Sequence, residues 1–184
     1  MVSVSDFEPG LAGGLVLGTA LAPAMENITY SNCTVIGALA GIRIKFRPSQ
    51  DGLVRGILFE DIRIIDPVVY AIDIIMSSDH YTAAQPTWGP VGTVNLQGVT
   101  IRDVQGTLGP VPTEVCGVGR KCPRAVGRFS CTTEFPCTNM RLEHVHVGGF
   151  RPYPDRHGQI VQPCTFSNFS GYSEDVEPPG CAFG

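Results

Sequence analysis

The chain has 184 residues, with 13 Lys and Arg against 17 Asp and Glu, so its formal net charge is −4. This balance offers no excess of positive charge to neutralise phosphates and therefore disfavours nucleic-acid binding. Hydrophobic residues make up 43% of the chain, which is too many for a disordered protein. The 22 glycines and 15 prolines disfavour long helices. A single all-β domain over residues 1–184 is expected.

The first apolar run covers residues 11–24 and ends in small residues, as a signal peptide does. The residues before it include Asp6 and Glu8 but no Lys or Arg, which contradicts a signal peptide. The run is also shorter than the roughly 18 apolar residues of a membrane-spanning helix. We therefore expect no membrane segment here. If the protein is secreted, we expect a signal and part of the N-terminus to precede this sequence.

Cysteine content and sequence motifs favour a secreted protein. Seven cysteines are many for a cytosolic protein of this length. Three N-x-[ST] triplets are candidate glycosylation sites, a modification of secreted proteins. The candidate acceptors are Asn27, Asn32 and Asn168.

Four segments of the chain share one pattern, and they span residues 25–35, 54–64, 96–106 and 137–147. Apolar residues alternate in each segment, slip by one position at a polar residue, and then alternate again. Alternation predicts a strand with one buried face. The slip predicts a sharp corner, because Asn and Asp tolerate a left-handed backbone. The predicted corner residues are Asn32, Asp61, Asp103 and His144, and the predicted inward residues include Ile28, Tyr30, Ile57, Phe59, Val99, Ile101, Met140 and Leu142.

A second strand is predicted after two of these segments, at residues 41–46 and 71–76. The copies are unequally spaced, which indicates loops inserted at fixed corners of a coiled parallel β-solenoid of about four coils. Like positions would then stack on successive coils. A β-sandwich would instead need hairpin turns between adjacent strands. No Asn-Gly or Asp-Gly turn links these strand pairs.

Three motifs resemble those of glycoside hydrolase family 28, the polygalacturonases and their relatives. NITYSNCTV at 27–35 followed by GIRIK at 41–45 is similar to that family's N-[IV]-T-V-x-N-C-T and G-[IVL]-R-I-K motifs. GVTIRDVQGT at 98–107 resembles its late strand motif, and CTTEFPC at 131–137 resembles its C-x-x-x-x-P-C pair. The resemblance extends over about residues 12–181.

The resemblance implies a right-handed parallel β-helix that is N-terminally incomplete in this chain. It also implies a secreted, monomeric pectin hydrolase that cleaves α-1,4-galacturonosyl bonds by inverting acid–base chemistry, without a cofactor. The expected partner is an acidic polysaccharide of the cell wall, and no nucleic acid or membrane partner is expected.

The motifs that carry the catalytic carboxylates in the family have no counterpart in this chain. The segment AGGLVLGT at 12–19 resembles the family's H-G-G-x-V-x-G-S variant, but Ala12 stands where that motif has histidine. Glu60 and Asp61 are adjacent and should face opposite sides of a strand, and residues 174–175 are expected in a solvated tail. No catalytic residue is therefore identified, and this chain alone is expected to be inactive.

The chain could be a fragment, a mis-predicted gene product or a degenerate relative. The alternative functions are a non-catalytic acidic-polysaccharide-binding β-helix and a structural one.

Arg43 and Lys45 are the strongest candidates for substrate binding. They lie two residues apart and should share the outer face of one strand, while Ile42 and Ile44 face the core. The resemblance assigns this Arg and Lys to substrate binding. It also implies a binding tyrosine after the next strand, for which Tyr81 in the loop at 77–93 is a candidate. Asp73 lies between two isoleucines and should either point outward or line a site.

The resemblance implies two disulfides, Cys131–Cys137 and Cys164–Cys181, the second tying down a tail at 150–184. A third pair, Cys116 with Cys122 in an insertion at 107–124, is our own expectation, and Cys33 lacks a partner. No metal site is expected. His144 and His146 have a spacing that could bind a metal, but no third ligand is nearby, and the C-x₂₋₄-C pairs of zinc sites do not occur.

Overall fold

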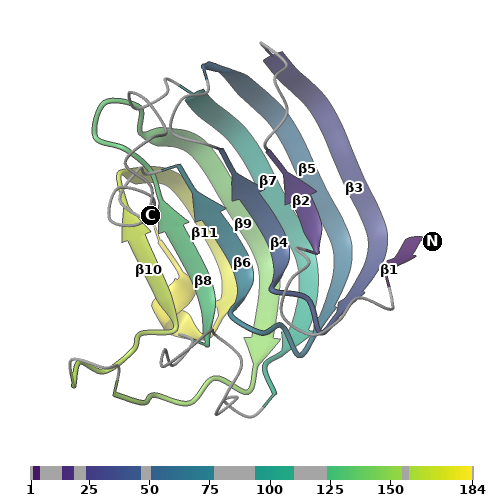
Figure 1. Ribbon diagram of the computed structural model, residues 1–184, viewed down its shortest axis with the longest axis vertical. Coiled ribbons are helices and arrows are strands. Elements are labelled where there is room, and N and C mark those ends of the chain that lie inside the picture. Colours follow the sequence, from purple (N-terminus) through teal and green to yellow (C-terminus); the bar gives the residue numbers. More distant parts are fainter. Residues whose placement is uncertain are drawn as a thin grey trace, which may run out of the picture.

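The computed structural model describes residues 2–4, 14–18, 24–46, 51–76, 94–109, 124–154 and 158–183. They form two sheets in which neighbouring strands are parallel (Figure 1). Sheet A contains, in spatial order, β1 (Val2–Val4), β3 (Ala24–Ile36), β5 (Gly52–Ile65), β7 (Val94–Thr107), β9 (Cys137–Gly148) and β11 (Phe169–Glu177). Sheet B contains β10 (Cys164–Ser167), β8 (Ala125–Ser130), β6 (Tyr70–Ile75), β4 (Ala40–Lys45) and β2 (Leu15–Leu17). A short helix, η2 (Pro179–Cys181), lies near the C-terminus.

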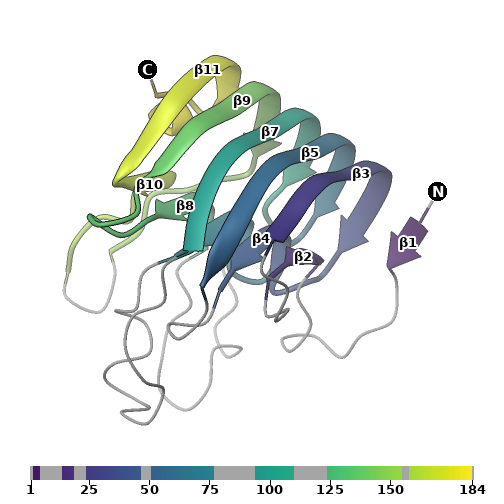
Figure 2. The same cartoon turned by 90° about the horizontal axis from the view of Figure 1, so that it is seen from above.

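From β2 onward the chain alternates between the two sheets, so each coil is one strand of sheet B followed by one strand of sheet A. Figure 2 shows the strands of sheet A arching one behind another, with the N-terminus and the C-terminus at opposite ends of the stack. The predicted parallel β-helix is therefore confirmed, with about five coils where the repeats predicted about four. None of the described helical segments is long and apolar enough to cross a membrane.

The predicted inner rows are confirmed by the register of sheet A. Ile57 pairs with Ile28 on one side and with Val99 on the other, and Phe59 lies between Tyr30 and Ile101 in the same way. The rings of Tyr30 and Phe59 stack with their centroids 4.9 Å apart. Ile57 and Phe59 are 1% and 0% exposed, so these rows are the centre of the hydrophobic core.

The predicted corners are also confirmed. All four corner residues have positive φ angles of 52–53°, and Asp175 adds a fifth at 51°. A second column of positive φ angles, which the sequence did not predict, crosses the same strands five residues earlier at Asn27, Gly56, Gly98 and Asn139. Each long strand of sheet A therefore bends twice, which is why it can wrap around the core.

The fifth coil, β10 and β11, lies within the segment expected to be a tied tail. Its inward rows hold Gly171 opposite Met140 and Ser173 opposite Leu142, so the apolar alternation that marks the other strands is absent. The chain end covers the second of these positions, whereas Gly171 is exposed. The Ser173 hydroxyl donates to the carbonyl of Phe183 and accepts from its N–H.

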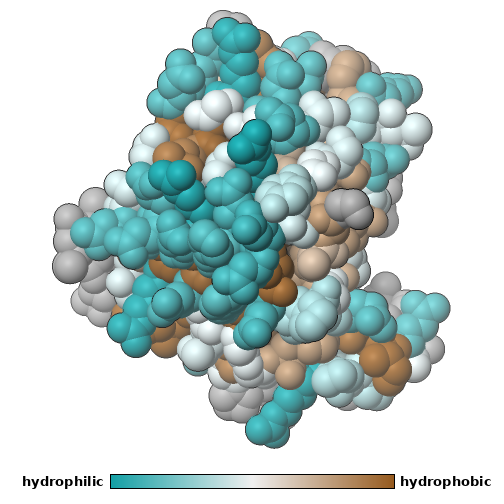
Figure 3. Space-filling model, turned by 180° about the vertical axis from the view of Figure 1, so that it is seen from behind, coloured by the Kyte–Doolittle hydropathy of each residue, from teal (hydrophilic) through white to brown (hydrophobic). Residues whose placement is uncertain are grey.

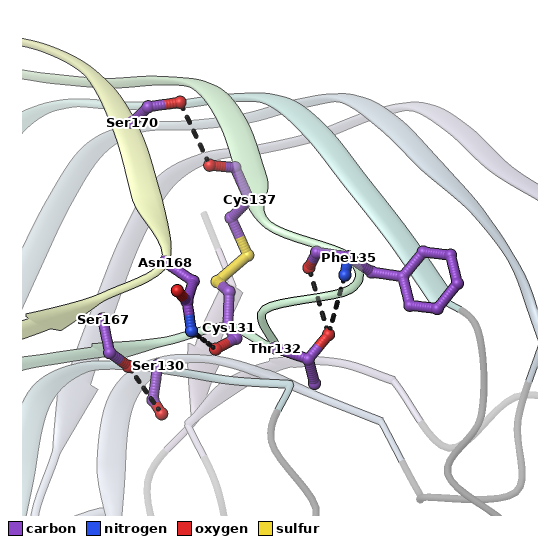
Figure 4. Close-up of a disulfide and its surroundings, with 8 residues drawn as sticks. All are labelled: Ser130, Cys131, Thr132, Phe135, Cys137, Ser167, Asn168 and Ser170. Atoms are coloured by element: carbon purple, nitrogen blue, oxygen red, sulfur yellow. Dashed lines mark hydrogen bonds between the residues drawn. A yellow bond between two sulfur atoms is a disulfide. The ribbon is translucent and has the colours of Figure 1, made fainter.

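Aromatic rings and two disulfides lie around the fourth and fifth coils. The ring of Phe166 packs against those of Phe129, Phe169 and Phe183, with centroids 4.9–5.8 Å apart. Both disulfides implied by the resemblance are present, Cys131–Cys137 and Cys164–Cys181. In Figure 4 the Asn168 amide donates to the Cys131 carbonyl at 2.9 Å, beside the first disulfide. Cys33 is buried and forms no disulfide with another cysteine of the described residues.

Candidate functional site

Strand β4 presents Arg43 and Lys45 on the outer face of sheet B, as predicted. Ile42 and Ile44 alternate with them and are both 0% exposed in the core. Arg43 and Lys45 are each partly exposed. The two cations therefore share one face because the strand has a period of two and its other face is buried.

The register of sheet B places two further charged residues in the row of Arg43. Arg43 pairs with Asp73 of β6, and Asp73 pairs with Arg128 of β8. Asp73 is 1% exposed, and the side chains of Arg43 and Arg128 are 16% and 14% exposed. Asp73 thus points outward from its strand and is nevertheless buried, between two arginines.

The two arginines contact Asp73 in different ways. Arg128 donates from Nε to Oδ1 at 2.8 Å, and its Nη2 lies 2.8 Å from the same oxygen. Arg43 Nε lies 3.1 Å from Oδ2, but in a geometry that makes an ion pair without a hydrogen bond. Two guanidinium groups around one carboxylate leave one net positive charge, to which Lys45 adds another.

Tyr70 packs against Arg128 in this row. The Arg128 guanidinium lies 4.6 Å from the centre of the Tyr70 ring, a cation–π contact. Burial raises the pKa of the Tyr70 hydroxyl above its usual value, the nearby Arg128 partly opposes this shift, and Asp73 and Tyr153 add to it. Tyr70 therefore stays neutral over the physiological range and restricts the position of Arg128.

Asp73 is the one acidic residue on the five strands of sheet B. The other acidic residues considered in the sequence have neighbours of their own on sheet A. Glu60 accepts from Arg102 at 2.6 Å, and Asp61 is a corner residue. Glu174 and Asp175 are exposed, as predicted, but they lie on strand β11 and not in an irregular tail, and Asp175 lies 3.1 Å from His146. The described residues contain no group of three His, Cys, Asp or Glu that could hold a metal.

A groove of about 380 Å³ lies elsewhere, on the outer face of sheet A. Neither Arg43 nor Lys45 lines it. Most of its polar lining comes from one outer row of sheet A, which holds Arg63, Gln105, His146 and Glu177. Thr107, two residues after Gln105 on β7, also lines the groove. In Figure 3, the side of the molecule turned away from the viewer in Figure 1 is largely covered by hydrophilic residues, with hydrophobic residues in separate patches.

Several predicted residues cannot be placed at this site. Ala12, Tyr81, Cys116 and Cys122 lie outside the described residues. Among the glycosylation candidates, Asn27 and Asn32 are exposed corner residues. The amide of Asn168 donates to Cys131, so its nitrogen already has a hydrogen-bond partner. Arg128, which sequence reasoning missed, lies on a strand with no recognised repeat motif.

Residues 10–157 match the family described as glycosyl hydrolases family 28. The chain belongs to this family. The match covers the four complete strands of sheet B from β2 to β8 and four long strands of sheet A, so the row that contains Arg43 lies within family 28 sequence.

Several curated proteins are similar to the chain. It is 31% identical over 99 residues to a probable endopolygalacturonase B of Aspergillus kawachii and 34% identical over 98 residues to a polygalacturonase of Penicillium digitatum. Both matches cover 52% of this chain and 26% of the relative. A probable endopolygalacturonase D of Neosartorya fischeri is 33% identical over 127 residues, or 68% of this chain and 23% of the relative. The chain thus spans about a quarter of these relatives. No solved structure matches it significantly.

Proposed function

We propose that this family 28 chain binds the galacturonan of pectin, outside the cell, through the outer face of sheet B. The observation that carries the proposal is the placement of Arg43 and Lys45 on one partly exposed face with a net positive charge. A galacturonate residue offers a carboxylate. The planar fork of an arginine can bind that group in a bidentate manner, and a lysine can neutralise it as a point charge.

Two other findings support this proposal. The similar fungal proteins are named as polygalacturonases and endopolygalacturonases, enzymes that act on polygalacturonate. The disulfides Cys131–Cys137 and Cys164–Cys181 are typical of proteins that fold in an oxidising compartment.

We also propose that this chain alone does not hydrolyse galacturonan. Glycosidic hydrolysis requires two carboxyl groups on either side of the scissile bond, one to donate a proton and one to activate water or attack. The strands of sheet B carry one carboxylate, Asp73, and two arginines hold it in an ion-pair network. The described strands of sheet B therefore offer no pair of carboxyl groups that could lie on either side of a glycosidic bond. Binding and orientation without an acid and a base leave most of the barrier in place.

The binding proposal is tested by titrating the purified chain with tetragalacturonate in a calorimeter. Replacing Arg43 by alanine should weaken binding about tenfold or more, because a charge-assisted hydrogen bond contributes ~1.5–3 kcal/mol. Added salt should also weaken binding. The matched control is Arg55→Ala, since Arg55 is an exposed arginine of sheet A paired with Glu26. Equal affinity for a neutral tetrasaccharide would contradict the proposal.

The second expectation is that a reducing-end assay on polygalacturonate between about pH 4 and 7 gives no turnover above a boiled control. The assay should use soluble chain whose cooperative melting shows that it is folded. Turnover that disappears in the Arg43→Ala, Lys45→Ala double variant would mean that the acid and the base are both in this chain.

One observation favours a second candidate, a structural β-helix with no sugar site. Arg43 is already paired with Asp73, as an arginine with a purely structural role would be. Under that function, Arg43→Ala would lower stability and leave no tetragalacturonate binding to be lost, because the unsubstituted chain would not bind it.

A further inference from the structure

We propose that Asp73 is a positioning residue for substrate recognition. Arg128 holds the Asp73 carboxylate in place, and Asp73 in turn orients the Arg43 guanidinium toward a uronate carboxylate. This inference rests on the proposed function and extends it to two residues that do not themselves need to touch the ligand. The residues Arg43, Asp73 and Arg128 come from three neighbouring strands and form one row across sheet B.

The first step is the anchoring of Asp73. Two nitrogens of Arg128 contact Oδ1 at 2.8 Å, so the carboxylate is held by a planar group and not by a single flexible donor. Tyr70 lies against the Arg128 guanidinium at 4.6 Å and limits its movement. With Oδ1 engaged in this way, the remaining oxygen, Oδ2, is directed at the neighbouring strand β4.

The second step is the orientation of Arg43. Oδ2 lies 3.1 Å from Nε, so Asp73 approaches the guanidinium from its inner side. The two terminal nitrogens lie on the opposite side of the group, and they form the fork that binds a carboxylate in a bidentate manner. Among the described residues, Asp73 is the one acidic partner of Arg43 within ion-pair distance. This charge contact, which is made without a hydrogen bond, keeps the partly exposed Arg43 side chain beside Asp73.

The third step concerns charge. Arg43 and Arg128 are separated by one strand, or about 9–10 Å at the usual strand spacing. A buried carboxylate between them reduces their repulsion without cancelling their combined charge. If Asp73 affected ligands through charge alone, its removal would strengthen binding of every anion. If Asp73 positions Arg43, its removal weakens binding of the uronate chain, although the face becomes more positive.

The two explanations predict opposite changes in affinity for the uronate chain. Asp73→Asn is therefore the decisive variant, because it removes the charge of the side chain and keeps its shape. Calorimetric titrations with tetragalacturonate and with dextran sulfate, a polyanion without uronate geometry, should be run on the same preparations. We expect tetragalacturonate to bind about tenfold more weakly or worse, as for the loss of a charge-assisted hydrogen bond. Dextran sulfate should bind equally well or more tightly.

A second variant keeps the test decisive if Asp73→Asn does not fold. Arg128→Lys retains the charge but loses the planar two-nitrogen contact with Asp73, so it should show the same selective loss. Arg55→Lys is its matched control, because it makes the same exchange in an exposed ion pair on sheet A. Cooperative thermal unfolding of each variant shows that the fold is intact.

The outcomes separate this inference from the proposed function. If the unsubstituted chain binds tetragalacturonate and Arg43→Ala loses that binding, the proposed function stands. Unchanged or tighter tetragalacturonate binding by Asp73→Asn and Arg128→Lys would then overturn the positioning role alone, as would an equal loss of both ligands. If the unsubstituted chain does not bind tetragalacturonate, the proposed function itself fails, and the inference fails with it.

Discussion

Replacing Phe59 by alanine is expected to lower the free energy of unfolding by about 3–5 kcal/mol. Phe59 is 0% exposed and lies in the middle of an inner row, between Tyr30 and Ile101. The substitution would remove the ring stacked on Tyr30 and leave a cavity that neighbouring backbones cannot close, because their spacing is set by sheet hydrogen bonds. Urea denaturation followed by circular dichroism measures the change.

The matched control for Phe59→Ala is Tyr172→Ala, which removes a ring of similar size from an exposed position on β11. Tyr172 is 51% exposed and hydrogen bonds to Glu174 at the surface. It should cost well under half as much as the core substitution, because a side chain exposed to this degree leaves no cavity. Equal losses for the two variants would mean that Phe59 is not in a packed inner row.

Replacing Asp73 by alanine should have an effect of similar size, about 3–5 kcal/mol, for an electrostatic reason. The substitution leaves Arg43 and Arg128 mostly buried, with no counter-charge between them. Removal of one partner from a buried ion pair costs more than the pair itself contributes, since the desolvated charge that remains is uncompensated. The unfolding free energy in urea, measured at neutral pH, gives the size of the effect.

Glu26→Ala is the control for Asp73→Ala. Glu26 also pairs with an arginine of a neighbouring strand, Arg55 at 2.9 Å, but the Arg55 side chain is 56% exposed. An exposed ion pair contributes about 0–1 kcal/mol, so this variant should be nearly as stable as the unsubstituted chain. A loss for Asp73→Ala no larger than that for Glu26→Ala would contradict the burial of the Arg43–Asp73–Arg128 row.

The coiled architecture could be predicted from the sequence because its rules are local. A strand with one buried face requires apolar residues at every second position, and Ile57 with Phe59 satisfies this requirement within three residues. A corner requires a residue that tolerates a positive φ angle, and Asp61 supplies it two residues after Phe59. The placement of Arg43 and Lys45 on one face follows from the same two-residue period.

The fifth coil could not be predicted in this way. The inward positions of β11 hold Gly171 and Ser173, which carry no hydrophobic signal. They are tolerated because β11 is the last strand of sheet A among the described residues, and Ser173 bonds to the returning chain at Phe183. Whether a position faces a neighbouring coil depends on what the rest of the chain places beside it.

The sequence by itself determined the parallel coils, the corners, the two disulfide pairs through family resemblance, and the shared face of Arg43 and Lys45. Only the tertiary structure decided that Arg43, Asp73 and Arg128 form one charged row. Their alignment depends on the register of three strands, and loops of unequal length separate those strands in the chain. Register is set by backbone hydrogen bonds and by the stacking of the buried rows. A pattern confined to one strand therefore shows which face a side chain occupies, but not which residue of the next coil it meets.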